Sequence, residues 1–237
     1  MNAAEDNDAL VSILAAATQA LGFERFAIGH HVDIRRRPYD AISLTSYPDE
    51  WVGEATAKGY HIDDPILIAS TRTAVGFKWS DVRNIMTLTD RQERILERGK
   101  EFGLSEGYTV PVHIPGEYWG TCSFGASSLE LVDDCSLRAA QLLGVFGFEA
   151  ARRLVRQSLP DGGNEHIPLL TPRQVDCVTL IAQGKTDWEA AQVLGLSRET
   201  VHQHIETARQ RYGVTKRTQL VVRAIYDGQI PFSSVIN

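Results

Sequence analysis

The chain has 237 residues, 43% of them hydrophobic and 23% charged, with a formal net charge of −6. That mixture can build ordinary hydrophobic cores and excludes intrinsically disordered, collagen-like and low-complexity chains, while the length favours two domains. Three widely separated cysteines exclude a disulfide framework and a CxxC zinc site, and the sequence shows neither a signal peptide nor an apolar run of the ~18 residues that a membrane helix needs. We therefore expect a cytoplasmic protein with no membrane association.

The first 160 residues predict helices that alternate with strands. A first helix is expected to end at Gly22, and its apolar face comprises Leu10, Ile13, Leu14, Ala17 and Leu21. Strands are expected at 23–32, 40–47, 107–114 and 118–127, with turns at 35–39 and 115–116, and further helices at 49–58, 64–73, 88–103 and 133–157. This order predicts an α+β domain in which an antiparallel sheet lies between helices, an α/β/α sandwich.

The predicted helix at 133–157 carries two apolar stripes. One is rich in small residues and comprises Leu137, Ala140, Gly144, Gly147 and Ala151, whereas the other comprises Leu143, Phe146, Ala150 and Leu154. One stripe can cover the sheet, and the small-residue stripe would allow another helix to approach closely. Burial of both stripes within the domain and a homodimer contact through one of them are both compatible with this pattern.

A break in the pattern separates the two domains. Residues 159–168, LPDGGNEHIP, contain two prolines and two adjacent glycines, which interrupt any helix. We therefore assign a first domain to 1–160, a linker to 161–168 and a second domain to 169–237. The second domain has eight Lys or Arg against six Asp or Glu, a charge of +2, which leaves −8 for the rest of the chain. This uneven charge favours the second domain as the part of the chain that binds a polyanion.

The second domain has the pattern of a helix-turn-helix. Thr171 caps a first helix that ends at Gly184. The spacing of Ala191, Gly195 and Val201 suits two helices that cross closely, with the glycine in a left-handed turn. Because further helices flank this pair, we expect a small all-α, four-helix domain that binds double-stranded DNA.

The segments LTPRQ, AQGKTDWEAAQVLGLSRETVHQHI and RYGVTKRTQ resemble the DNA-binding domain of the LuxR family. The resemblance implies that the second helix of the motif enters the major groove of promoter DNA. It places His202, Gln203 and Glu206 toward base edges, where Gln203 would pair with adenine. It also places five residues against phosphates, which fix the register without reading the sequence: Lys185, Arg198, Thr200, Lys216 and Arg217.

Three residues depart from the family pattern in this domain. Gln174 stands where the family nearly always has Glu, and Val178 stands where it has Leu. Both occupy capping or packing positions, so we expect that these two departures leave the fold unchanged. Glu206 is unusual on a surface that approaches phosphates, and the alternative is a solvent-facing acid that pairs with Arg209 or Arg211.

The first domain resembles the autoinducer-binding domain of LuxR-type quorum-sensing regulators. The resemblance rests on SYPDEW at 46–51, on GYHIDDP at 59–65, and on the spacing of Trp51, Asp64 and Trp79. Asp64 follows Trp51 by 13 residues and Trp79 follows Asp64 by 15, as in that family. Together the two resemblances cover essentially the whole chain, and they imply a ligand-responsive transcriptional regulator that acts as a homodimer and contacts RNA polymerase.

The resemblance implies an N-acyl- or aryl-homoserine lactone as the ligand and gives roles to particular side chains. The Trp51 indole N–H would donate to the lactone carbonyl, and the Asp64 carboxylate would accept from the amide N–H. Tyr47 and Ser123 would donate to the acyl carbonyl, and Trp79 would pack on the lactone ring. Four residues are candidates for further apolar contacts, although plain core packing is the stronger expectation for each: Ile28, Leu44, Ile66 and Val75. Core packing is the plain alternative for each aromatic residue, and a helix cap is the plain alternative for Asp64.

Ala55 changes the expected wall of the ligand pocket. The family usually carries an aromatic residue at this position, four residues after the tryptophan, and that ring lies over the acyl chain. The space left by the smaller Ala55 side chain would admit a bulkier, branched or aryl ligand tail, or would be filled by Tyr60, Tyr118 or Trp119. An orphan regulator that answers a non-lactone signal is therefore the alternative function.

Other functional classes fit the sequence poorly. A phosphorylated receiver needs paired acids after its first strand, and the residues there are Gly29, His30 and His31. The two histidines and Asp33 lack a further metal ligand at a suitable spacing, and Ser123 lacks the GxSxG elbow of a nucleophile. We therefore expect no enzyme, no metal and no cofactor besides the small-molecule ligand.

Overall fold

The computed structural model describes residues 6–33, 41–114, 117–158 and 168–236. The chain forms two compact units, Met1–Gly163 and Asn164–Asn237, and each is described separately. The turn expected at 35–39, the turn at 115–116 and most of the linker expected at 161–168 lie outside the described residues. Across the described ranges no helix is both long and apolar enough to cross a membrane.

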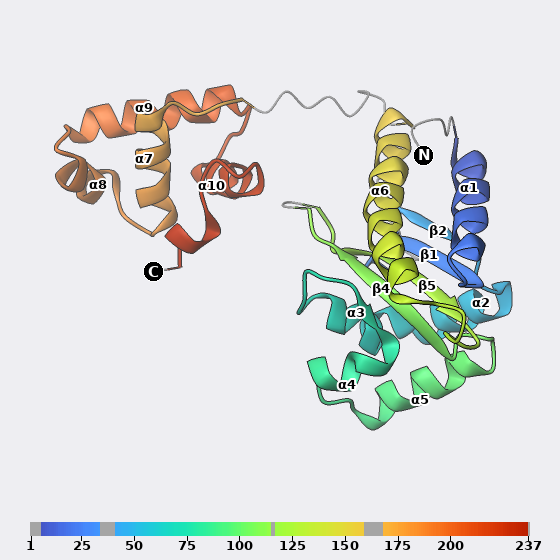
Figure 1. The fold of residues 1–237 in the computed structure, drawn as a ribbon. Coiled ribbons are helices and arrows are strands. Elements are labelled where there is room, and N and C mark those ends of the chain that lie inside the picture. Colours follow the sequence, from blue (N-terminus) through green and yellow to red (C-terminus); the bar gives the residue numbers. More distant parts are fainter. Residues whose placement is uncertain (1–5, 34–40, 115–116, 159–167, 237) are drawn as a thin grey trace. The chain divides into compact units, whose positions relative to one another are not determined.

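The first unit contains a five-stranded antiparallel sheet with the strand order β2-β1-β5-β4-β3. Its strands are β1 Arg25–His30, β2 Ser43–Thr45, β3 Phe77–Lys78, β4 Glu106–Val112 and β5 Gly120–Ala126. Helices α1 Asn7–Ala20 and α6 Asp134–Ser158 cover one face. The opposite side carries α2 Asp49–Lys58, α3 Pro65–Ser70, α4 Val82–Ile85 and α5 Asp90–Lys100, as Figure 1 shows. The expected α/β/α arrangement is confirmed.

Several predicted elements are shorter in the structure, and five of the described elements were missed. The helix expected at 64–73 ends at Ser70, and the strand expected at 40–47 is limited to Ser43–Thr45. The missed elements are β3, helix α4 and the 3₁₀ turns Tyr60–Ile62, Trp79–Asp81 and Phe232–Ser234. Each of these has at most four residues, which is too few to display a helical or strand period.

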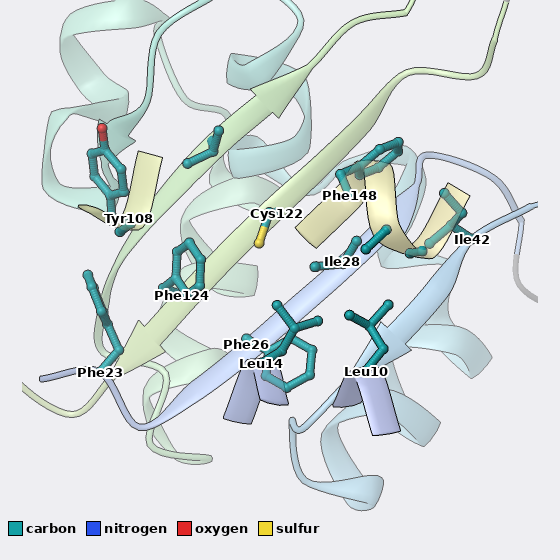
Figure 2. Close-up of a cluster of buried hydrophobic side chains, with 14 residues drawn as sticks. Leu10, Leu14, Phe23, Phe26, Ile28, Ile42, Tyr108, Cys122, Phe124 and Phe148 are labelled. Atoms are coloured by element: carbon teal, nitrogen blue, oxygen red, sulfur yellow. The ribbon is translucent and has the colours of Figure 1, made fainter. Parts of the chain in front are cut away.

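The main core lies between the sheet and helices α1 and α6. Figure 2 shows Phe26, Ile28, Cys122 and Phe124 on the sheet face that meets these helices. The first helix buries Leu10 and Leu14, but Ile13, expected on the same face, is 36% exposed, and the polar Thr18 is buried in its place.

The small-residue stripe of α6 faces the sheet and not another molecule. A Cβ atom added at Gly144 would lie 2.9 Å from the Val110 Cβ atom, so the helix backbone packs directly on β4. The larger stripe is divided, because Leu143 and Leu154 pack against the core while Phe146 is 60% exposed. The small-residue stripe is therefore buried within the domain, which is one of the two arrangements that the sequence left open, and the outward face of α6 is apolar.

The second unit is the expected all-α domain. It contains α7 Pro172–Ala182, α8 Asp187–Leu194, α9 Arg198–Arg211 and α10 Arg217–Tyr226. Gly195 ends α8 with φ +65°, the left-handed conformation that the motif requires. Gln174 completes a capping box by accepting from the Thr171 backbone N–H at 3.0 Å, and Val178 is buried. Both departures from the family pattern are thus compatible with the fold.

Candidate functional site

A cavity of about 220 Å³ lies on the face of the sheet away from α1 and α6. Strands β1, β2 and β5 form one wall, and α2, α3 and α5 form the other. Eight of the residues predicted to contact a ligand line it: Tyr47, Trp51, Ala55, Tyr60, Asp64, Ile66, Trp79 and Ser123. The structure therefore brings together side chains that are up to 76 positions apart, from Tyr47 to Ser123.

A chain of hydrogen bonds orients the hydroxyl of Ser123. The Trp79 indole Nε1–H donates to Thr109 Oγ1 at 2.9 Å, and Thr109 Oγ1 lies 2.8 Å from Ser123 Oγ. Because the Thr109 oxygen already accepts from Trp79, the arrangement favours Thr109 as the donor to Ser123 and leaves the Ser123 proton for the cavity. Thr109 was missed by the sequence reasoning, although its place opposite Ser123 follows once the β4–β5 register is known.

Asp64 caps a helix and faces the cavity at the same time. Its Oδ1 atom accepts from the backbone N–H of Ile66 at 2.8 Å and of Leu67 at 3.4 Å, at the start of α3. Within the described residues, Oδ2 accepts no hydrogen bond from the protein. Burial raises the pKa of this carboxyl, while the two backbone bonds oppose that shift. A further N–H donor would therefore stabilise the charged form.

Two aromatic side chains complete this end of the cavity. Trp51 is only 8% exposed and packs against Tyr60 and Phe102, with ring centroids 5.7 and 5.5 Å apart. No acceptor for its indole N–H is found in the described part of the chain. Burial raises the pKa of Tyr47, so its phenol stays protonated and can act as a donor. The cavity therefore offers hydroxyl and indole donors beside a single carboxylate acceptor.

Some predicted contacts lie elsewhere. Tyr118 and Trp119 are 44% and 48% exposed, and their rings pack against His30 and His113 instead of lining the cavity. Val75 is 68% exposed and also lies outside it. Ile28 and Leu44 border the cavity, but their side chains pack in the core between the sheet and helices α1 and α6, which is the alternative of plain core packing.

The opposite end of the cavity is polar, which the sequence reasoning did not foresee. His31 and Thr121 line it, with His31 Nε2 at 3.4 Å from Thr121 Oγ1. The pKa of His31 is lowered to about 4, mainly by burial and in addition by the charges of His113 and His30. Within the described ranges, no group of three or more His, Cys, Asp or Glu side chains could hold a metal ion.

The lowered pKa of His31 predicts an acid-sensitive fold. An unfolded histidine titrates near pH 6.5, so between about pH 6.5 and 4 the unfolded chain binds a proton that the folded chain excludes. The free energy of unfolding should then fall by up to ~1.4 kcal/mol per pH unit on acidification through this window. Urea unfolding of the wild type and His31→Gln at a series of pH values checks this. His113→Gln, the control, should keep most of the slope, and an unchanged slope in His31→Gln would contradict the assignment.

Helix α9 presents a polar face to solvent. Val201 and Ile205 are buried, whereas His202 and Gln203 are exposed on the other side of the helix. His202 Nδ1 lies 3.1 Å from Asp187 Oδ2, and an Arg217 terminal nitrogen lies 3.0 Å from Asp187 Oδ1. Asp187 thus links two residues that were both predicted to contact DNA, and it was not singled out from the sequence.

The remaining predicted DNA contacts differ in their surroundings. Glu206 forms an ion pair with Arg209 at 2.6 Å, which is the alternative that the sequence left open. Thr200 Oγ1 lies 2.8 Å from Ser197 Oγ at the helix N-terminus. Arg198, Lys216 and Arg217 are exposed, and Lys185 is half-buried.

Comparisons with known proteins match both units. A family model described as "Autoinducer binding domain" covers residues 6–154, and one described as "Bacterial regulatory proteins, luxR family" covers residues 168–224. The transcriptional activator protein BjaR1 of Bradyrhizobium diazoefficiens is 27% identical over 91% of this chain and 86% of its own length. The transcriptional activator protein VanR of Vibrio anguillarum is 26% identical over 94% of this chain and 92% of its own. The crystal structure of Escherichia coli SdiA shares the fold, with a TM-score of 0.62 at 22% identity, over 97% of this chain and 94% of that one.

Proposed function

Because this chain belongs to the LuxR family of transcriptional regulators, with an autoinducer-binding domain and a helix-turn-helix domain, we propose that it binds an N-acyl- or aryl-homoserine lactone and, as a homodimer, promoter DNA. Members of this family are regulators and not enzymes. The observation that carries the proposal is the cavity in which Trp51, Asp64 and Ser123 converge from α2, the start of α3 and β5. No cofactor is part of the proposal, and contact with RNA polymerase would follow from the DNA-bound state.

The polar groups of the cavity match the polar groups of such a lactone. The amide N–H of the ligand would donate to Asp64 Oδ2, and the lactone carbonyl would accept from the Trp51 indole. The acyl carbonyl would accept from Tyr47 and from the Ser123 hydroxyl, because the Trp79–Thr109 chain favours Thr109 as the donor to Ser123. Because the pKa of buried Asp64 is raised, donation by the ligand would relieve the cost of holding this carboxylate ionised.

Calorimetric titration of the full chain with a panel of acyl- and aryl-homoserine lactones tests the first half of this proposal. At least one lactone should bind with a single site per chain, and mass spectrometry of the denatured complex should recover it intact. Mobility-shift assays with promoter DNA, with and without that lactone, test the second half. If no lactone on the panel binds while a non-lactone extract ligand does, the chain is the orphan regulator that Ala55 left open.

The homodimer is predicted to form through the outward face of α6. Leu142, Val145 and Phe146 are 61%, 44% and 60% exposed on neighbouring turns of this helix. Single helix-turn-helix units read few base pairs, so a symmetric pair is needed for specificity. Leu142→Glu and Phe146→Glu together should convert the ligand-bound protein to a monomer in light scattering. Ile62→Glu, at a comparably exposed apolar residue outside α6, should remain dimeric. A monomeric wild type, both with ligand and on DNA, would refute this prediction.

A further inference from the structure

The polar end of the cavity, formed by His31 and Thr121, has no role in the lactone recognition described above. Both side chains line the cavity, and His31 Nε2 lies 3.4 Å from Thr121 Oγ1. A well-formed hydrogen bond between such atoms measures about 2.7–3.2 Å. The two groups therefore satisfy one another only weakly, and each retains the capacity to bind a better-placed partner inside the cavity.

The register of the sheet sets the distance between this polar end and the groups that would hold the lactone. Strand β5 pairs Ser123 with Ala27 of β1 and pairs Thr121 with Gly29. Thr121 therefore lies two residues along the strand from Ser123 and on the same face, an advance of ~7 Å. Between the two hydroxyls, the β1 residues that face the cavity are Ala27 and Gly29, whereas the Ile28 side chain packs into the core on the opposite face of the sheet, so no bulky β1 side chain stands in the path. One aromatic ring or a short alkyl chain spans that distance.

The hydrogen-bonding capacity of His31 and Thr121 indicates which chemical group would bind at the polar end. The His31 imidazole is neutral at physiological pH, since its pKa is about 4, so one ring nitrogen donates and the other accepts. The Thr121 hydroxyl also donates and accepts. A hydroxyl group is complementary to this pair because it does both at once, whereas a methyl terminus would leave both polar groups poorly satisfied.

On the assumption that the proposed lactone function holds, we infer that the ligand tail ends in a hydroxyl group that hydrogen-bonds to His31 and Thr121. The spacer between this hydroxyl and the acyl carbonyl is either a single aromatic ring or a short alkyl chain. In either form, the hydroxyl at the end of the tail determines which lactone this protein recognises.

Two matched pairs of synthetic lactones test the inference on the full chain. The aromatic pair is a para-hydroxyphenyl-acyl lactone and its phenyl analogue, and the alkyl pair is a terminally hydroxylated hexanoyl lactone and the hexanoyl lactone. In calorimetric titrations the hydroxyl member of one pair should bind about tenfold more tightly than its analogue. The pair that shows the difference identifies the spacer.

Variants of His31 and Thr121 provide a second test of the inferred hydroxyl contact. Thr121→Val, which keeps the shape of the side chain, and His31→Phe should each abolish the preference for the hydroxyl while leaving the affinity for the analogue nearly unchanged. His113→Phe is the control, because its ring is exposed and lies outside the cavity. Thr121→Val alone suffices as the test if His31→Phe does not fold.

The outcomes separate this inference from the function on which it rests. Equal affinities within both pairs, with the lactones binding, would overturn the hydroxyl contact and leave lactone recognition intact. A preference that persists in Thr121→Val would overturn the assignment to these residues. Failure of every lactone to bind would overturn the proposed function and this inference together.

Discussion

The Asp64→Asn variant is expected to bind the lactone about ten- to a hundredfold more weakly than the wild type. The substitution keeps the shape of the side chain, but it replaces a buried carboxylate acceptor by an amide that offers a weaker acceptor or a donor toward the ligand N–H. Loss of a hydrogen bond to a charged group costs ~1.5–3 kcal/mol, which corresponds to this range of affinity. Calorimetric titration of both proteins with the same lactone measures the effect.

Stability measurements can separate this effect from simple unfolding. Asparagine retains an oxygen that can accept from the Ile66 backbone N–H, and it removes a charge that burial disfavours. The ligand-free variant should therefore unfold at the same temperature as the wild type or a higher one. Asp63→Asn is the matched control, because it makes the same change next door at a side chain that is 37% exposed and paired with Arg91. Undiminished lactone affinity in Asp64→Asn would show that this carboxylate is only a helix cap.

Several residues that line the cavity could be predicted because the family carries them at fixed spacings. Trp51, Asp64 and Trp79 lie in α2, at the start of α3 and in a 3₁₀ turn, and nothing in helical or strand periodicity brings these three elements together. The resemblance to a family supplied that proximity, and the structure places all three in the cavity wall. The cap role of Asp64 was also foreseeable, since Asp before Pro favours a helix start.

The residues that were missed depend on strand register. Alternation along a predicted strand divides its side chains between two faces, but it does not say which face meets a cavity or which partner lies opposite. Thr109, Thr121 and His31 come close to the predicted ligand-binding residues only through the pairing of β4, β5 and β1. A register shift of one residue would move each of them to the other face of the sheet.

The two apolar stripes of α6 also show where prediction from the sequence is limited. Both are apolar, so hydrophobicity alone does not decide which one packs on the sheet. The decision comes from volume: the side chains of Val110 and Cys122 project from the sheet toward the helix, and only a residue without Cβ fits at Gly144. The larger residues, Phe146 among them, are left on the outside.

The DNA-facing surface is expected to divide into residues that read bases and residues that anchor the backbone. If Gln203 meets a base edge, Gln203→Ala should relax the preference at one or two base pairs by ~1–3 kcal/mol. Arg217→Ala should instead weaken binding to every sequence and lower the salt slope by about one unit, because it removes a phosphate contact. Asp187→Asn releases Arg217 and His202 from their shared carboxylate, so it should change phosphate anchoring through Arg217 and the preference at the base that His202 meets.

The Glu206→Ala variant distinguishes most clearly whether Glu206 contacts a base or is a solvent-facing acid. The ion pair between Glu206 and Arg209 at 2.6 Å favours a solvent-facing carboxylate over a side chain that contacts a base edge. Removing the acid should then release Arg209 and reduce repulsion from phosphates, so that affinity rises while the selected motif stays the same. A base-reading role would instead broaden the motif at one position. Binding-site selection with both Gln203→Ala and Glu206→Ala at two salt concentrations distinguishes these results, and a motif unchanged by both substitutions would mean that a different face of α9 enters the groove.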